Sequence, residues 1–276
     1  MPTVKANGIN INYESHGTGE PLVMINGYGG NLRGWDIQVP FLSKKYCVIT
    51  LDNRGTGHSD KPDIPYTIRM MADDVAGLLD ALNIDAAHIC GFSMGGAIAQ
   101  EFAINYPQRV ISLILGCSGF GGSHETKRDP AVDAQLLNMK NFSSWTPEYY
   151  IREILPGGYT EEFINKNLQF IKEMIKHRSA YPATPSYVYE RQAKAVLEEH
   201  DTYDRLNQIK APTLILVGSA DPLSPLENSR ILASRIPNSE LVILENLRHA
   251  FNIEAAEKTN NLILDFLNRH RRTTKE

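Results

Sequence analysis

The sequence lacks the long apolar run that a membrane-spanning helix requires. No stretch of its 276 residues approaches the roughly 20 consecutive apolar residues that cross a bilayer. Residues 1–5 also lack the apolar core of a secretory signal peptide. We therefore expect a cytoplasmic protein with no membrane partner.

An excess of charge of one sign is also missing. The chain has 28 Lys and Arg residues against 32 Asp and Glu residues, a net charge of -4. Its one basic block, residues 269–272, is typical of a solvated helix end, where cations suit the helix dipole. Without a broader basic surface, we predict that the protein binds no nucleic acid.

Cysteine is rare. The three cysteines are odd in number, lie in apolar strand-like runs and show no spacing typical of metal ligands. This pattern favours reduced core residues over disulfides or a metal site. The remaining composition, 42% hydrophobic and 22% charged, is that of a globular protein with one large or two small domains.

The first 122 residues alternate between strand and helix patterns. Asn7-Gly8 lies between two alternating runs and predicts a β-hairpin. Further segments are continuous apolar runs that predict buried strands, at residues 21–25, 46–51, 87–90 and 110–115. Apolar residues at helical spacing follow in residues 67–82 and 96–106. This alternation predicts an α/β fold, with a mostly parallel sheet covered by helices on both faces.

The pattern changes between residues 123 and 210 and then returns. Strand-like runs disappear there, and Thr146, Thr160 and Thr184 each begin a predicted helix as its N-cap. The helix that begins at Thr160 is expected to continue to residues 176–178. We predict a core of residues 1–122 and 211–276, with residues 123–210 as an inserted helical cap. The cap holds eleven aromatic residues, and the sequence leaves open which of them line a pocket.

The segment Gly91-Phe92-Ser93-Met94-Gly95 places a serine between a predicted strand and a predicted helix. A Gly-x-Ser-x-Gly match arises readily by chance, because glycine and serine are common. The strand before it and the helix after it are the context that the motif requires. A side chain at Gly91 or Gly95 would collide with a neighbouring element, so we expect a tight turn that exposes the hydroxyl of Ser93.

A serine becomes a good nucleophile only beside a base that an acid orients. Ser93, Asp221 and His249 each follow the end of a predicted strand, and ligands bind at that edge of an α/β sheet. The other seven histidines lie in loops, at a strand start, in the cap or in the tail. Asp52 also follows a strand, but the turn after it favours a role in holding that loop.

With these residues in place, the whole chain resembles the α/β-hydrolase superfamily. The resemblance depends on the serine turn, on Asp52-x-Arg54-Gly55-x-Gly57-x-Ser59, on Gly218-x-x-Asp221-x-x-x-Pro225 and on the late His249. It implies an eight-stranded, mostly parallel sheet with an inserted helical cap, and no metal or organic cofactor. Members include esterases, lactonases such as 3-oxoadipate enol-lactonase, carbon–carbon hydrolases, thioesterases and cofactor-free haloperoxidases.

The resemblance also assigns roles. It implies that Ser93 is the nucleophile, His249 the base and Asp221 the orienting acid. An oxyanion hole is expected from the backbone N–H groups of Met94 and Tyr28. The family's haloalkane dehalogenases use aspartate as the nucleophile, so Ser93 argues against that activity.

Two positions depart from the pattern of many relatives. Asn26-Gly27 replaces the usual His-Gly, and we expect Asn26 to hydrogen-bond the loop and preserve the oxyanion hole. Arg248 replaces a glycine before His249 and adds a cation near the expected pocket rim. One hypothesis is that Arg248 attracts anionic substrates.

The resemblance implies hydrolysis of a small carboxylic ester or lactone through an acyl-enzyme intermediate. Carbon–carbon bond hydrolysis, peracid-dependent halogenation and a slow-turnover small-molecule receptor remain alternatives. The sequence leaves open the physiological substrate and the choice between a monomer and a homodimer.

Overall fold

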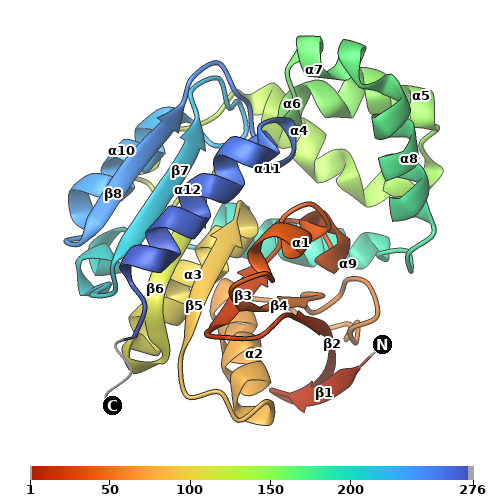
Figure 1. Cartoon of the computed structure of the whole chain (residues 1–276). Helices are drawn as coiled ribbons and strands as arrows, with labels where there is room; N and C mark the ends of the chain where they lie inside the picture. Colours follow the sequence, from red (N-terminus) through yellow and green to blue (C-terminus); the bar gives the residue numbers. More distant parts are fainter. Residues whose placement is uncertain (1, 273–276) are drawn as a thin grey trace.

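The computed structural model describes residues 2–272, without the side chains of residues 142–143 and 178–179, and shows helices packed on both faces of one central sheet (Figure 1). The sheet has eight strands: β1 (Thr3–Ala6), β2 (Ile9–His16), β3 (Pro21–Ile25), β4 (Cys47–Leu51), β5 (Ala87–Phe92), β6 (Val110–Gly116), β7 (Thr213–Gly218) and β8 (Ser239–Leu244). Their spatial order is β1-β2-β4-β3-β5-β6-β7-β8. The predicted α/β fold class is therefore confirmed.

Only the β1–β2 and β2–β4 pairs are antiparallel, and the other strand pairs are parallel. The predicted hairpin joins β1 to β2, with Asn7 and Gly8 at φ angles of 45° and 82°. Both angles are those that a tight two-residue hairpin turn demands. Because β3 and β5–β8 run parallel, their carboxyl ends meet at the same edge of the sheet.

Alternate residues of each central strand face opposite layers of helices. In β3, Val23 and Ile25 belong to one apolar cluster, and Leu22 and Met24 belong to another. The first cluster includes α2 (Ile68–Ala81), α3 (Met94–Asn105) and α10 (Leu226–Arg235). The second includes α1 (Val39–Leu42), α11 (Phe251–Glu254) and α12 (Ala256–Arg269). Burial on both faces explains why these strands are continuous apolar runs in the sequence.

The chain between β6 and β7 is helical and lies over the carboxyl edge of the sheet (Figure 1). Its α-helices are α4 (Pro130–Asn138), α5 (Pro147–Tyr149), α6 (Leu155–Gly158), α7 (Glu161–Lys166), α8 (Leu168–Ser179) and α9 (Ser186–Ala193). Four of its buried apolar side chains, with two tyrosines, form a separate cluster: Tyr150, Leu155, Tyr159, Ile164, Ile171 and Ile175. This small core supports the proposed cap of residues 123–210, whose limits stay a prediction.

The cap signals are partly confirmed. Thr146 and Thr160 are N-caps, each accepting a hydrogen bond from a backbone N–H of the first turn. The prediction for Thr184 is wrong, because α9 begins one residue later with Pro185 at its N-cap. The helix predicted to run from Thr160 to residues 176–178 ends early. The side-chain amide of Asn167 donates to the carbonyl of Phe163 at 2.9 Å, and Asn167 is the C-cap of α7.

Within residues 2–272, none of the helices has both the length and the apolar character needed to cross a bilayer.

A buried ion pair ties the loop after β4 to helix α2. Arg54 Nε and Nη2 donate to the two carboxylate oxygens of Asp74 at 2.6 and 2.5 Å. The two side chains are 2% and 3% exposed. Burial raises the pKa of Asp74, and the Arg54 guanidinium opposes that shift. The pair therefore holds the Asp52–Arg54 turn in place only while both charges are present.

The Arg54→Met variant is expected to lose about 3–5 kcal/mol of unfolding free energy, because the Asp74 carboxylate is left buried without its partner. The matched control is Arg69→Met, on helix α2, which also carries Asp74. Arg69 pairs with Asp73 at the surface, with the two side chains 48% and 33% exposed, so its loss should cost less than about 1 kcal/mol. Urea denaturation measures both, and equal losses would contradict a structural role for the buried pair.

Candidate active site

The turn between β5 and α3 holds Ser93 in an unusual backbone conformation. Its φ of 57° and ψ of -125° lie in a region that residues other than glycine rarely occupy. The Ser93 N–H donates to the carbonyl of Gly116 at 2.8 Å, and the Ser93 carbonyl accepts the N–H of Gly96 at 2.8 Å. These bonds fix the turn at the carboxyl edge of the sheet and leave the hydroxyl of Ser93 free to face the cap.

The flanking glycines are required by close backbone contacts. A Cβ atom added to Gly91 would lie 2.0 Å from the carbonyl oxygen of Gly95. One added to Gly95 would lie 2.2 Å from the carbonyl oxygen of Ile25. Both neighbours are main-chain atoms of packed elements, so neither can move aside. The expected collision at both glycines is confirmed.

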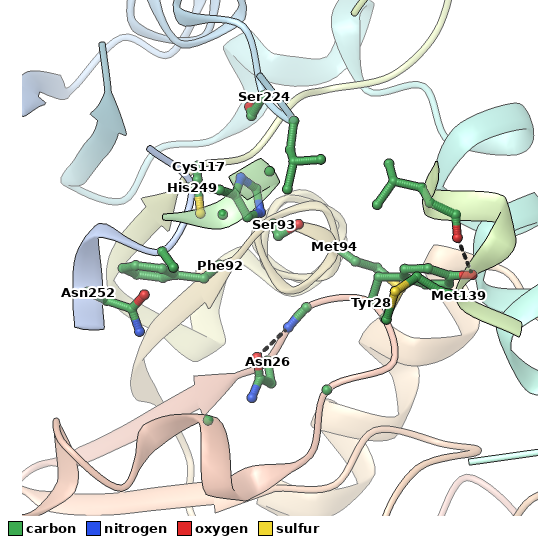
Figure 2. Close-up of a pocket in the computed structure, with 18 of the residues that line it drawn as sticks. Asn26, Tyr28, Phe92, Ser93, Met94, Cys117, Met139, Ser224, His249 and Asn252 are labelled. Carbon is green, nitrogen blue, oxygen red and sulfur yellow. Dashed lines mark hydrogen bonds between the residues drawn. The ribbon is translucent and has the colours of Figure 1, made fainter. Parts of the chain in front are cut away.

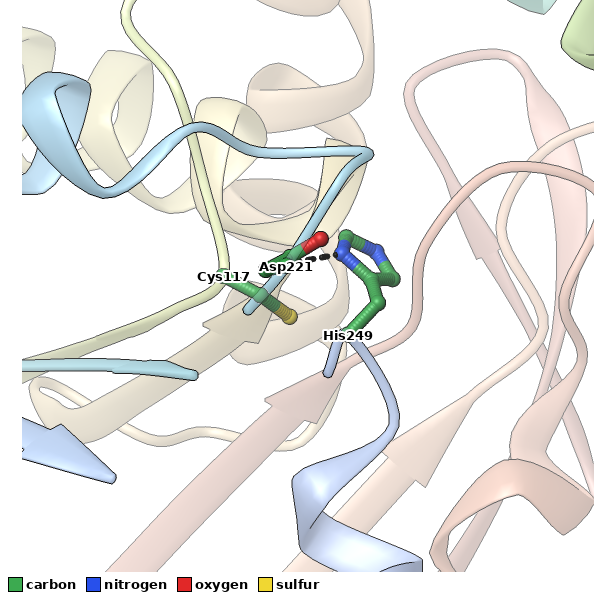
Figure 3. A group of neighbouring side chains, drawn as sticks. All are labelled: Cys117, Asp221 and His249. Atoms are coloured by element: carbon green, nitrogen blue, oxygen red, sulfur yellow. Dashed lines mark hydrogen bonds and ion pairs between the residues drawn. The ribbon is translucent and has the colours of Figure 1, made fainter. Parts of the chain in front are cut away.

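Asp221 and His249 form a hydrogen-bonded pair (Figure 3). Asp221 follows β7, His249 follows β8, and the His249 Nδ1 lies 2.8 Å from the Asp221 Oδ2. The other carboxylate oxygen accepts the backbone N–H groups of Leu223 at 2.8 Å and Ser224 at 3.0 Å. The Asp221 side chain is fully buried. Its charge therefore acts on His249 without competition from water.

The structure brings Ser93 to this pair. Ser93 and His249 line the same cavity, and Figure 2 shows both side chains at its wall. Burial would lower the pKa of His249, but the neighbouring Asp221 carboxylate outweighs it and raises the pKa well above its usual value. Such a ring can accept a proton and be stabilised in its charged form.

The loop after β3 also contacts Ser93. A Cβ atom added to Gly27 would lie 3.0 Å from the Cβ of Ser93, so this backbone passes directly beside the serine. Asn26 accepts the Gly27 N–H at 2.8 Å and donates to the carbonyl of Asn31 at 2.6 Å. The expectation that Asn26 organises this loop is confirmed.

Two backbone N–H groups at this point are free to donate. Within the described chain, neither the Tyr28 nor the Met94 N–H has a hydrogen-bond partner. The N–H groups of Gly27, Gly29 and Gly30, in contrast, are all satisfied within the protein. Both Tyr28 and Met94 line the cavity beside Ser93. Unpaired N–H groups in this place can stabilise a negatively charged oxygen.

Helix α9 of the cap holds the Tyr28 loop, a contact that the sequence did not reveal. Gln192 accepts the N–H of Gly29 at 2.9 Å and donates to the carbonyl of Arg54 at 3.1 Å. The Tyr28 hydroxyl lies 3.1 Å from the carbonyl of Tyr189. The only signal in the sequence was a glutamine on the buried side of a cap helix.

The rival acid, Asp52, has the structural role that its sequence context favoured. Its carboxylate is fully buried and accepts the N–H groups of Leu32 and His58, both at 2.8 Å. It also accepts the side chains of Asn12 at 2.8 Å and Tyr181 at 3.2 Å. Asp52 therefore joins three core segments to the cap and has no contact with His249.

Arg248 lies away from the cavity. Within the described residues it is not part of the cavity wall, and its guanidinium donates to the carbonyl of Pro156 in the cap. This contact ties the His249 loop to helix α6. The structure therefore gives no support to the hypothesis that Arg248 attracts anionic substrates.

The cavity lies between the core and the cap and has a volume of about 620 Å³. Three of the cap aromatics line it: Tyr150, Tyr159 and Phe170. Its wall also includes aliphatic and thioether side chains of the cap, namely Leu136, Met139, Ile154, Leu155, Met174, Val196 and Leu197. The side chain of Phe142 lies outside the described part of the structure. The serine therefore faces a largely apolar chamber.

Gly95→Ala should destabilise the protein by about 1–3 kcal/mol, because the new methyl group overlaps a main-chain oxygen of β3. Gly157→Ala is the matched control, since its nearest neighbour would lie 3.5 Å away. Guanidinium denaturation followed by circular dichroism compares the two. A Gly95→Ala variant as stable as Gly157→Ala would show that the turn tolerates a side chain.

Comparison with known proteins identifies the family of this chain. The family model described as "alpha/beta hydrolase fold" matches residues 20–256. A putative carbamate hydrolase of Azorhizobium caulinodans is 29% identical over 96% of this chain and 98% of its own length. A 2-hydroxy-6-oxo-6-phenylhexa-2,4-dienoate hydrolase of Comamonas testosteroni is 32% identical, over 93% and 91%.

Among solved structures, an enol-lactonase from Burkholderia xenovorans LB400 superimposes with a TM-score of 0.84. It is 28% identical, and the alignment covers 97% of this chain and 100% of the lactonase. The match of the family model to most of the chain, together with these relatives, shows that this protein belongs to the alpha/beta hydrolase family.

Proposed function

We propose that this protein is a serine hydrolase that cleaves a carboxylic ester or lactone through an acyl-enzyme intermediate. The observation that carries the proposal is the strained turn at Ser93, which lies in the wall of the same cavity as His249, the partner of Asp221. A candidate nucleophile, a candidate base and a candidate orienting acid therefore belong to one site.

The first step is attack of the Ser93 oxygen on the substrate carbonyl carbon. His249 takes the serine proton on Nε2, because Nδ1 donates its own proton to Asp221. The buried carboxylate stabilises the imidazolium that forms. The protonated ring then gives its proton to the leaving alcohol, and the acyl group stays on Ser93.

The negative oxygen of the tetrahedral intermediate is held by the free N–H groups of Tyr28 and Met94. Met94 is also the first residue of α3, whose positive dipole end faces the same point. Loss of one oxyanion donor typically lowers kcat about 10²–10³-fold. Because Gln192 fixes the Tyr28 loop, the cap helps to place one of the two donors.

Water completes the cycle. His249 deprotonates a water molecule that attacks the acyl-enzyme, and the proton returns to Ser93 as the acid leaves. Each of these steps uses groups of the chain itself, so the proposed reaction requires no metal or organic cofactor.

The cavity favours a larger substrate than the simplest esters. Its volume of about 620 Å³ falls within the range of roughly 300–1,000 Å³ found for pockets of drug-sized ligands. Its wall is mostly apolar, and an acetate ester would leave much of it unfilled. We therefore infer an ester or lactone that carries an apolar chain or ring.

Carbon–carbon bond hydrolysis is the second candidate. The substrate named for the 32% identical relative contains no ester or lactone bond, so its hydrolysis must break a carbon–carbon bond. The same serine and histidine can serve that chemistry. A panel of p-nitrophenyl esters, lactones and vinylogous 1,5-diketo acids separates the two candidates by kcat/KM.

Labelling by a fluorophosphonate probe tests the nucleophile. Wild type should be labelled, whereas Ser93→Ala and His249→Ala should not, because one lacks the hydroxyl and the other the base. Ser118→Ala is the matched control, since Ser118 is a buried serine of the same cavity wall. Folded wild type that stays unlabelled, or a labelled Ser93→Ala variant, would refute the serine mechanism.

The pH profile tests the role of Asp221. The base must be neutral, so kcat/KM should rise with pH as His249 loses its proton, and its pKa lies above the usual value of 6.5. Asp221→Asn removes the charge that raises this pKa. The rising limb should move to lower pH, and kcat should fall about 10⁴-fold. Hydrolysis of p-nitrophenyl butyrate between pH 5 and 9 measures both, and an unmoved limb would contradict the assignment.

A further inference from the structure

A sulfur atom lies beside the His249–Asp221 pair, and the proposed reaction does not use it. Figure 3 shows the Cys117 side chain next to Asp221 and His249. One ligand atom from each of the three residues lies within 4.8 Å of the other two. Cys117 is 3% exposed and is not in a disulfide.

The sheet explains this cluster. Cys117, Asp221 and His249 follow β6, β7 and β8, which are adjacent parallel strands whose carboxyl ends meet. The Cys117 backbone has a φ of 41°, and its N–H donates to the carbonyl of Leu216 at 2.8 Å. The thiol is therefore held in position by the strand ends, as the carboxylate and the imidazole are.

We propose that Cys117, Asp221 and His249 form an inhibitory site for a thiophilic divalent cation such as Zn²⁺. Thiolate sulfur, imidazole nitrogen and carboxylate oxygen are the ligands that zinc prefers. The inference rests on the proposed function, because it assigns to the metal the same histidine that serves as the base.

To bind one ion, the nitrogen and the oxygen must move apart, and the sulfur, which lies within 4.8 Å of both, must approach them by up to about 1.2 Å. With zinc bonds of about 2.0–2.3 Å, tetrahedral ligands lie about 3.4–3.6 Å apart. The His249 Nδ1 and Asp221 Oδ2 are now 2.8 Å apart, with a proton between them. A metal ion that replaces this proton requires them to separate by about 0.6 Å.

The charges also balance. Zn²⁺ displaces the proton of the Cys117 thiol to solvent, and the resulting thiolate and the Asp221 carboxylate together neutralise the ion. A buried metal ion is tolerated when its charge is compensated in this way. The ion can arrive through the cavity, because Cys117 and His249 both line it.

Binding stops catalysis for a specific reason. With the metal on Nδ1, the proton that Nδ1 carried moves to Nε2, so the neutral imidazole is protonated at the atom that must accept the proton of Ser93. Mg²⁺ and Ca²⁺ prefer six or more oxygen ligands, so they should not bind this sulfur-containing site. Inhibition should therefore be selective for thiophilic ions.

The test compares zinc inhibition of chelator-treated wild type, Cys117→Ala and Cys117→Ser during hydrolysis of p-nitrophenyl butyrate. Each rate is taken relative to the same variant without metal, and only variants with wild-type thermal unfolding are compared. Wild type should be inhibited by ZnCl₂ but not by MgCl₂, with recovery on addition of EDTA. Loss of the sulfur should weaken inhibition by more than about 100-fold, since loss of even an outer partner of a metal ligand costs 10–100-fold. Cys90→Ala, which removes another buried cysteine, should behave like wild type.

A second measurement does not depend on activity. Co²⁺ added to wild type should give a thiolate-to-cobalt absorption band that Cys117→Ala lacks. Equal zinc inhibition of wild type and Cys117→Ala, or no cobalt band in folded wild type, would overturn the proposed site. If wild type hydrolyses no ester yet gives the cobalt band, the proposed function fails while the metal site stands.

Discussion

The site depends on the close backbone contact between the serine turn and strand β3. The positive φ of Ser93 costs on the order of 1–3 kcal/mol in a residue with a side chain, so the surrounding structure must enforce it. Gly95 lies against the carbonyl of Ile25, and the Ser93 N–H bonds to Gly116 on the neighbouring strand. These contacts on both sides hold the hydroxyl at the sheet edge, and the rest of the site is arranged around that point.

Burial does two different things to the acidic residues. Asp52 and Asp221 are both nearly inaccessible, and each accepts two backbone N–H groups. Asp52 also accepts hydrogen bonds from the side chains of Asn12 and Tyr181, and these bonds connect the core to the cap. Asp221 uses one oxygen for its loop and presents the other to His249, which makes its charge available to the site. Placement, and not residue type, separates the two roles.

Under the proposed function, the cap contributes to both substrate choice and catalysis. Its side chains build most of the apolar wall of the cavity. Gln192 also fixes the loop that carries the Tyr28 N–H. A change in the packing of α9 should therefore alter the rate as well as the specificity.

The sequence by itself determined the sheet and the serine turn and identified Ser93, Asp221 and His249 as candidates, because each depends on local patterns: apolar runs, glycines beside a serine, and residues at strand ends. Two predicted helix ends were wrong, the start at Thr184 and the continuation past Asn167, because single residues decide where a helix starts and stops. Only the tertiary structure placed Gln192 on the Tyr28 loop, Arg248 against the cap and Cys117 beside the His249–Asp221 pair. Each of these contacts joins segments far apart in the chain, and such pairings are set by three-dimensional packing that no local pattern encodes.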